Sequence, residues 1–304
     1  MASEQLTNVM TLLRANRLPD DAPLADLRQW LETFATVTPP ADDVACAPVE
    51  GGAGEEGAGG VPAEWVIAAG ARDDAVVLYL HGGGYALGSI ATHRRLAGEV
   101  SRATGAKALL IDYRLAPEHP YPAAVDDAVA AYRWLLDQGH APAKLAVSGD
   151  SAGGGLAVAM LLALRDQGIP LPACAVPISP WVDMEASAES YTTCADIDPM
   201  VSQGGIKRFA DWYLAGQDLA GAPYASPLHG DLSGLPPLLV QVGEAEVLRD
   251  DSTQLVDKAR AAGVDATCEV SPDCPHVFHA LPGVPEAEEA LARLGAFVRT
   301  HLDP

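Results

Sequence analysis

The alternating hydrophobicity from residue 75 onward constrains the fold more than any other feature of this sequence. Short apolar runs, bounded by Gly, Pro, Asp or Ser, alternate with segments of helical periodicity. Runs without a polar side are typical of parallel strands buried between two layers of helices. The pattern therefore predicts an α/β fold with a mostly parallel sheet and helices on both faces. The expected strands are Ala75–Leu80, Ala108–Ile111, Lys144–Val147, Ala173–Ile178, Leu238–Val242 and Ala266–Val270. The expected helices are His93–Thr104, Val125–Gln138, Gly154–Gln167, Ser252–Ala262 and Pro285–His301.

Size and charge narrow the class of protein. The chain has 304 residues, enough for one large α/β domain with insertions. Hydrophobic residues make up 49% and charged residues 20%, which argues against disordered, fibrous and coiled-coil proteins. With 19 Lys and Arg against 41 Asp and Glu, the formal net charge is −22. Such a field repels nucleic acid and anionic lipid surfaces, and no run of about 18 apolar residues could span a membrane.

The cysteines and the first residues bear on the compartment. Five cysteines are scattered along the chain, an odd number without a disulfide framework. The segment Met1-Ala2-Ser3-Glu4-Gln5 has neither the basic nor the apolar region of a secretory signal. We therefore expect a reduced, cytoplasmic protein without disulfides.

Two segments lie outside the alternating pattern. Residues 1–45 predict short helices broken at prolines, which form a helical appendage, and Gly51–Gly60 predicts an exposed turn between two edge strands. About 60 residues separate the strands ending at Ile178 and starting at Leu238, more than a crossover needs. We expect an insertion at about 183–225 to form a lid over the carboxyl ends of the strands.

The segment Gly149-Asp150-Ser151-Ala152-Gly153-Gly154 contains a G-x-S-x-G motif between an expected strand and an expected helix. A sharp strand-to-helix turn exposes the serine hydroxyl, and small residues around it let strand and helix approach closely. Ser151 is therefore the candidate nucleophile. The amide N–H of Ala152 faces outward at the helix start, where it can bind a developing oxyanion.

A second glycine motif, His81-Gly82-Gly83-Gly84-Tyr85, follows the strand Ala75–Leu80. Three consecutive glycines cost conformational entropy and contribute no packing, so they favour a loop whose backbone approaches a ligand. The amides of Gly83 and Gly84, together with that of Ala152, would surround the oxyanion of a tetrahedral intermediate.

Together with Asp112-Tyr113-Arg114-Leu115-Ala116-Pro117-Glu118-His119-Pro120-Tyr121-Pro122-Ala123-Ala124, these motifs give the chain a family resemblance. From about Val61 onward it resembles the bacterial hormone-sensitive-lipase family of α/β-hydrolases, in the branch with Gly-Asp-Ser-Ala-Gly at the elbow. The resemblance implies an α/β-hydrolase domain over residues 46–304, a helical cap built from the N-terminus and the insertion, and no cofactor. It implies carboxylesterase activity on short- to medium-chain esters and dimerisation through a sheet edge. It assigns Arg114 and His119 a structural role.

A serine nucleophile needs a base. In an α/β-hydrolase the three catalytic residues follow one another along the chain in the order serine, acid, histidine. His276 follows the last expected strand and matches the catalytic histidine of the family, whereas His279 is expected to be a non-catalytic surface residue. The acid follows the strand Leu238–Val242. Glu246 lies in that turn where the family usually has Asp, so the loop must retract to accommodate the longer side chain. Asp250 is the alternative acid, although it and Asp251 are placed to cap the next helix.

Three other interpretations remain open at this point. Cys268, Cys274, His276 and His279 have the ligand types of a zinc site, although their spacing matches no usual pattern. A non-catalytic ligand receptor on this scaffold would be expected to lack a triad member. Acyl-serine chemistry could also open a lactone, an amide or a carbamate.

Aromatic residues of the insertion and the glycine-rich loop favour a small apolar ester as substrate. The candidate pocket residues are Tyr85, Trp181, Tyr191, Trp212 and Tyr213.

Overall fold

An eight-stranded sheet runs through the computed structural model, which describes residues 2–50 and 57–303. The strand order within that part is β1-β2-β4-β3-β5-β6-β7-β8. β2 runs antiparallel to β1 and β4, and all other neighbours are parallel, so the predicted mostly parallel sheet is confirmed. The strands are β1 Val44–Pro48, β2 Ala63–Ala68, β3 Arg72–Leu80, β4 Ala106–Ile111, β5 Leu145–Asp150, β6 Cys174–Ile178, β7 Leu238–Gly243 and β8 Ala266–Ser271.

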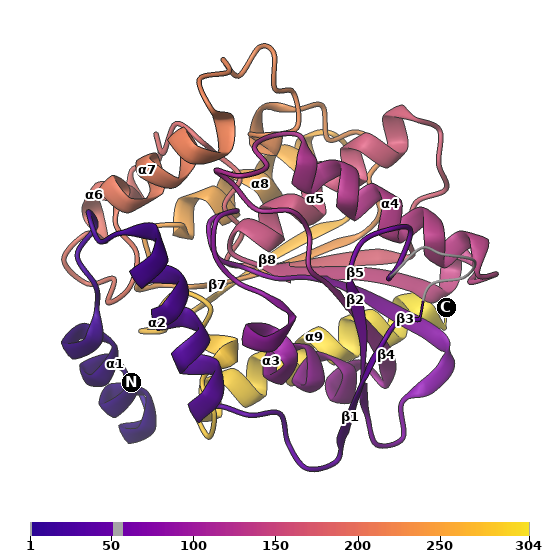
Figure 1. Ribbon diagram of the computed structural model, residues 1–304, viewed down its shortest axis with the longest axis horizontal. Helices are drawn as coiled ribbons and strands as arrows, with labels where there is room; N and C mark the ends of the chain where they lie inside the picture. Colours follow the sequence, from indigo (N-terminus) through magenta and orange to yellow (C-terminus); the bar gives the residue numbers. More distant parts are fainter. Residues whose placement is uncertain (1, 51–56, 304) are drawn as a thin grey trace.

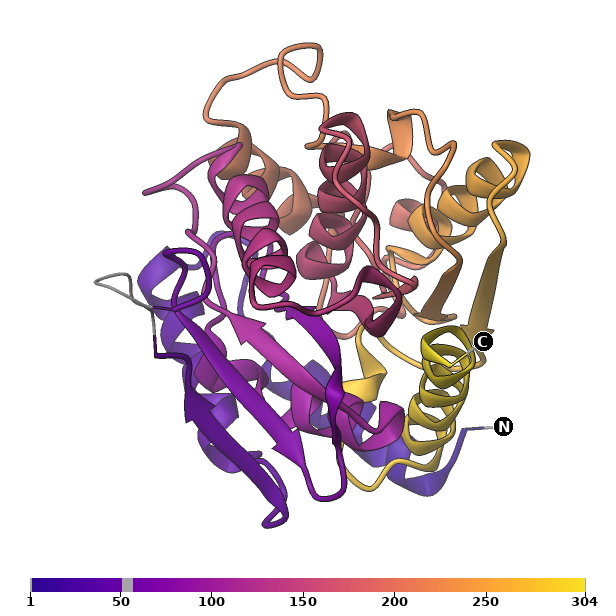
Figure 2. The same cartoon turned by 90° about the vertical axis from the view of Figure 1, so that its right-hand side faces the viewer.

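Helices cover both faces of the sheet (Figures 1 and 2). The two layers are held by separate apolar cores. Val76, Leu78 and Leu80 of β3 pack with helices α4, α5 and α8, whereas Val77 and Tyr79 pack with α3 and α9. Each fully buried aliphatic side chain contributes about 1.5–3 kcal/mol of transfer free energy. The longer helices are α1 Glu4–Asn16, α2 Leu24–Val37, α3 Ile90–Thr104, α4 Ala123–Asp137, α5 Ala152–Asp166, α7 Gln203–Leu214, α8 Arg249–Ala261 and α9 Pro285–Leu302. The short ones are α6 Ser190–Thr193, η1 Pro142–Lys144, η2 Pro227–His229 and η3 Phe278–Ala280.

β5 is the strand whose predicted end differs most from the structure. It continues three residues past Val147, and α5 begins at Ala152 rather than Gly154. Ser148, Gly149 and Asp150 are polar or small, but the first two pair with both β3 and β6, and Asp150 pairs with Ile178 of β6. Because the Ser148 hydroxyl donates to Val176 O, burial of this polar residue costs little. Hydrophobicity alone could not predict that extension.

The N-terminal helices and the insertion between β6 and β7 lie side by side, with α1, α2, α6 and α7 grouped at the left of Figure 1. The guanidinium of Arg208 in α7 donates to the carbonyls of Asp20 and Ala22 at 2.8 and 2.7 Å. Arg14 of α1 donates to Ile197 O at 3.2 Å. Two segments far apart in the sequence therefore form one joined structure.

The expected turn at Gly51–Gly60 lies for the most part outside the described residues. The strands that flank it, β1 and β2, pair antiparallel, with Val44 opposite Ala68. Among the described helices, none combines the length and the apolarity needed to cross a bilayer.

Candidate active site

Ser151 occupies the turn between β5 and α5 with a backbone conformation of φ 55° and ψ −122°. This strained geometry is possible because the neighbouring glycines allow close approach. A Cβ on Gly149 would lie 2.5 Å from the carbonyls of Gly153 and Leu80, and one on Gly153 would overlap Leu80 O. The Ser151 amide donates to Ile178 O at 2.9 Å, and its side chain stays partly exposed where the surrounding residues are buried. The structure thus presents the hydroxyl at the start of a helix.

The glycine-rich loop after β3 turns back beside this serine. Gly83 and Gly84 have φ values of 118° and 61°, which favour glycine, and both are partly exposed. Gly83 O accepts the amides of Ala86 and Leu87 at 3.1 and 2.8 Å, which closes the loop. In the part of the chain that the structure describes, no acceptor binds the amide N–H of Gly83, Gly84 or Ala152. These three donors are therefore available to a ligand.

Glu246 and His276 form a short, buried polar contact. His276 Nδ1 lies 2.6 Å from Glu246 Oε2, and the two residues are 6% and 0% exposed. The other carboxylate oxygen accepts the Ser179 hydroxyl at 2.7 Å and the Gly243 amide at 2.6 Å. The carboxylate is thus held on both oxygens, and it fixes Nδ1 as the protonated nitrogen of the ring.

Two opposing effects act on the pKa of His276. Burial lowers the pKa of His276, but the Glu246 carboxylate raises it by its charge and its hydrogen bond, and Asp198 and Asp150 add to this. The net result is a pKa above the ordinary value of histidine. The environment therefore favours the protonated ring, the form that a base acquires during catalysis.

Ser151 and His276 lie on the same side of the sheet, where the parallel strands have their carboxyl ends. Both follow the carboxyl end of a parallel strand, as do Glu246 and Gly83. Ser151 N binds Ile178 O, and the hydroxyl of the next residue, Ser179, accepts the amide of Val277 at 3.2 Å. Two hydrogen bonds therefore tie the serine turn to the histidine loop. A direct Ser151–His276 hydrogen bond is not formed among the described residues, and in unliganded enzymes this bond is often long.

The alternative acid, Asp250, points elsewhere. Its Oδ2 accepts the Ser190 amide at 2.9 Å, and its Oδ1 pairs with Arg249. The expectation that Asp250 and Asp251 cap α8 is wrong, because both lie within the first turn and no side chain caps the helix at Leu248. Asp251 instead accepts the amides of Val182 and Asp183, and burial raises its pKa to about 8. These aspartates hold the insertion against α8.

His279 is not the surface residue that the sequence predicted. It is 2% exposed, its Nε2 contacts Gln241 Oε1 at 3.0 Å, and burial lowers its pKa to about 3. The turn after His276 folds inward, because Phe278 packs into an apolar core with Leu6 of α1. His279 is therefore a neutral structural residue.

The four residues of the zinc interpretation have different neighbours. His276 contacts Glu246, His279 contacts Gln241, Cys274 packs beside α1, and Cys268 packs against the core under α8. Within the described ranges they do not form a group with metal-binding geometry. The zinc interpretation therefore has no support in the structure.

Three of the five aromatic residues assigned to the pocket pack together at the glycine-rich loop. The rings of Tyr85 and Tyr213 stack with centroids 3.9 Å apart, and Trp181 lies 5.8 Å from Tyr85. Tyr85, Trp181, Tyr191 and Tyr213 are almost completely buried, whereas Trp212 is partly exposed. The Tyr85–Tyr213 stack connects the glycine-rich loop to α7, and contact of the five side chains with substrate stays a prediction.

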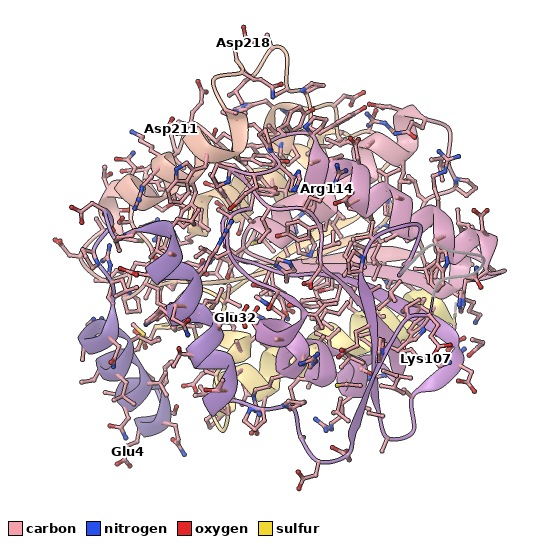
Figure 3. All side chains as sticks on the ribbon, in the orientation of Figure 1. Glu4, Glu32, Lys107, Arg114, Asp211 and Asp218 are labelled. Carbon is pink, nitrogen blue, oxygen red and sulfur yellow. The ribbon has the colours of Figure 1, made fainter. Side chains whose placement is uncertain are left out.

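The Asp-Tyr-Arg segment has structural contacts. The guanidinium of Arg114, labelled in Figure 3, pairs with Asp127 of α4 at 2.7 Å. Tyr113 donates its hydroxyl to His81 O at 2.7 Å and stacks on the His81 ring. His119 is exposed. The segment thus packs against His81, the first residue of the glycine-rich loop, through Tyr113.

Three residues of this region carried no motif in the sequence. Ser179 joins the acid and histidine loops, Asp198 contacts the acid loop, and the Phe209 ring lies against Gly84. A polar residue directly after a buried strand is the signal that could have identified Ser179. Asp198 and Phe209 belong to the insertion, whose contacts depend on tertiary structure.

Comparison with known proteins identifies the family. The family model described as "alpha/beta hydrolase fold" matches residues 77–280. The chain belongs to this family. It is 52% identical over 239 residues to the "Acetyl-hydrolase" of Streptomyces hygroscopicus, covering 78% of this chain and 79% of that protein.

Two solved structures of this α/β-hydrolase family match almost the entire chain. An esterase from the bacterial hormone-sensitive lipase family is 49% identical, with a TM-score of 0.93 and 99% of each chain covered. EstE5, in a crystal soaked with p-nitrophenyl butyrate, is 50% identical, with a TM-score of 0.93 and 100% of each chain covered. The resemblance to the bacterial hormone-sensitive lipase family is thereby confirmed, as is the α/β-hydrolase fold.

Proposed function

We propose that Ser151, His276 and Glu246 hydrolyse carboxylic esters through an acyl-serine intermediate. The protein is a carboxylic ester hydrolase, as its similarity to an acetyl-hydrolase and to esterases of the family indicates. The observation that carries the proposed residue roles is the buried Glu246–His276 pair, whose facing atoms are 2.6 Å apart. The pair and Ser151 all follow the carboxyl ends of parallel strands. A base oriented by a buried carboxylate is what a serine nucleophile requires.

Acylation follows from these positions. His276 Nε2 accepts the Ser151 proton as Oγ forms a bond to the ester carbonyl carbon, and the carbonyl oxygen becomes an oxyanion. The amides of Gly83, Gly84 and Ala152 donate to that oxyanion. The bond from carbon to the alcohol oxygen then breaks, and His276 returns its proton to the leaving alcohol. Water repeats the sequence on the acyl-serine, which releases the carboxylic acid and restores the hydroxyl.

Glu246 acts on the charge that His276 acquires. When the ring accepts a proton it becomes an imidazolium in a buried site, where an unpaired charge would be costly. The carboxylate at Nδ1 balances that charge and holds the ring in one orientation. The Ser179 hydroxyl and the Gly243 amide hold the carboxylate in place. Glu246 can therefore take the role that the family usually gives to an Asp.

Short- to medium-chain acyl groups are the proposed substrates. The named relatives act on acetyl groups or were soaked with a butyrate ester, and the aromatic side chains around the glycine-rich loop suit a small apolar acyl group. The test is turnover of p-nitrophenyl esters from acetate to laurate. We expect kcat/KM to peak between acetate and caproate and to fall steeply towards laurate. A kcat/KM for laurate equal to or greater than that for the short esters would contradict the proposed chain length. Turnover of lactones or amides but of no ester would contradict the proposed ester substrate.

We propose that residues 1–45 and the insertion at about 183–225 act together as a cap over a hydrolase domain of residues 46–304. Arg208 and Arg14 join these two segments by hydrogen bonds to backbone carbonyls, and Phe209 of α7 lies against Gly84. β1 begins at Val44, so the sheet starts slightly before the proposed domain boundary. This cap would shield the oxyanion loop from bulk water.

A homodimer through the β8 edge is also proposed. β8 lies at the end of the sheet, and Val270 on it is 40% exposed. An exposed edge strand is a ready template for pairing with a second copy. We expect light scattering to give the mass of a dimer, and Val270→Lys to give that of a monomer. A wild-type monomer at micromolar concentration would contradict this proposal.

The proposed location is the cytoplasm, with a small apolar ester as partner and neither nucleic acid nor membrane. The five cysteines are free thiols, and three of them are buried. The net charge of −22 is unsuited to anionic surfaces. Activity found in the periplasmic or culture fraction of the producing cell would contradict this assignment.

A further inference from the structure

A buried carboxylate from the insertion, Asp198, reaches the loop that carries Glu246. Asp198 is 3% exposed and lies between α6 and α7. Its Oδ1 accepts the amides of Met200 and Val201 at 2.9 and 2.8 Å, and its Oδ2 accepts the amide of Val247 at 2.9 Å. Three backbone donors on one carboxylate favour its ionised form. The contact with Val247 is the one that leaves the insertion.

The Val247 contact bears directly on the acid. Val247 follows Glu246 in the chain, so a hydrogen bond to its amide fixes the backbone from which the Glu246 side chain extends. Ser179 and Gly243 hold the carboxylate end of the same residue. Glu246 is therefore held at its backbone from the insertion and at its carboxylate from the sheet.

Charge provides a second, independent connection. Three carboxylates raise the pKa of His276 by their charge: Glu246 after β7, Asp198 from the insertion and Asp150 at the end of β5. Asp150 is already engaged with the Tyr79 hydroxyl at 2.8 Å. The interaction is mutual: burial holds the pKa of Asp198 above its ordinary value, and the charge of His276 and the three backbone donors act to lower it. The negative charge of ionised Asp198 thus stabilises the imidazolium when it forms.

We propose that Asp198 is a positioning residue for the Glu246–His276 pair, acting through its hydrogen bond to the Val247 amide and through the effect of its charge on the imidazolium. This inference rests on the proposed role of His276 as the base. It assigns the insertion, proposed above as part of the cap, a role in setting the geometry and the charge state of the base.

The test is the pH dependence of kcat/KM for p-nitrophenyl butyrate in wild-type protein and Asp198→Asn. The acid limb of this profile reports loss of the proton from His276 in the free enzyme. Without the negative charge the imidazolium is less stable, so His276 loses its proton at lower pH. We expect the limb to move down by about half a pH unit or more. We also expect kcat to fall about tenfold while KM stays within about twofold, as for loss of an interaction in the transition state.

A matched control separates positioning from general stability. Asp183 is another buried aspartate of the insertion, and it accepts the amides of Glu185 and Ser187, each at 3.0 Å. Asp183→Asn should lower the melting temperature without moving the acid limb. An equal shift of the limb in Asp183→Asn would overturn the proposal, because it would mark a general effect of disturbing the insertion.

A second variant keeps the proposal testable if Asp198→Asn does not fold. Asp198→Glu retains the charge but displaces the carboxylate from the Val247 amide, so we expect lower kcat with the acid limb near its wild-type position. The role of Asp198 would be overturned if Asp198→Glu kept the wild-type kcat, or if folded Asp198→Asn kept the wild-type acid limb of the kcat/KM profile. Either result would leave the proposed esterase function unaffected. Failure of the esterase itself has a different signature, since wild-type protein would then turn over no ester.

Discussion

Ser151→Ala is expected to lower kcat for p-nitrophenyl butyrate by about 10⁵- to 10⁶-fold while KM changes little. The reason is that Oγ forms the covalent bond to the acyl group, and no neighbouring side chain can replace it. The residual rate should come from the oxyanion donors Gly83, Gly84 and Ala152, which do not depend on the hydroxyl. Initial rates and active-site titration on purified protein provide the measurement.

The fold of the Ser151→Ala variant provides the control. The serine hydroxyl makes no hydrogen bond within the described residues, so its removal should leave the melting temperature unchanged or slightly raised. Relief of strain at φ 55° is not expected, because alanine has the same Cβ. Retention of more than about one hundredth of wild-type kcat by this variant would exclude Ser151 as the nucleophile.

Glu246→Gln is expected to lower kcat by about 10³- to 10⁴-fold. The amide has nearly the same shape, but it cannot balance the charge of the imidazolium. It can also present its NH₂ group to His276 Nδ1 and so favour the wrong tautomer. The pKa of His276 should fall with the loss of the carboxylate, so the acid limb of kcat/KM should move to lower pH. Stopped assays across the pH range measure both effects.

Asp250→Asn is the matched control for the acid. Asp250 is four positions along the same loop and helix, but its carboxylate holds the Ser190 amide and Arg249 rather than the histidine. We expect a change in kcat of less than about tenfold, because the asparagine oxygen can still accept from Ser190. A larger loss in Asp250→Asn than in Glu246→Gln would reverse the assignment of the acid.

The sequence predicted the sheet and the motifs because both depend on local patterns. The strands are recognisable as apolar runs. The glycines around Ser151 are required by the turn, because a Cβ on Gly149 or Gly153 would overlap Leu80 O. Glu246 could be placed after β7 by the same reasoning, since it lies in the loop at the carboxyl end of a strand.

Other features could not be predicted because they depend on distant contacts. Asp198 lies 49 residues before Val247, and nothing in the local pattern of the insertion indicates that its carboxylate meets that amide. The sequence places His279 at the start of the turn after His276 and so predicts a surface residue, but Phe278 anchors that turn in a core that includes α1. The hydrogen bond to Gln241 then satisfies the buried ring. Each case is a polar residue whose partner comes from another element of the fold.

The acyl-serine at Ser151 is the central claim, and covalent trapping tests it most directly. Wild-type protein, Ser151→Ala and Glu246→Gln are treated with phenylmethylsulfonyl fluoride, and the modified peptide is located by mass spectrometry. Attack of Oγ on sulfur displaces fluoride, so we predict one sulfonyl group on Ser151 of the wild type, none on Ser151→Ala, and much slower labelling of Glu246→Gln. Stoichiometric labelling of another residue with parallel loss of activity, or full activity after labelling of Ser151, would contradict the mechanism.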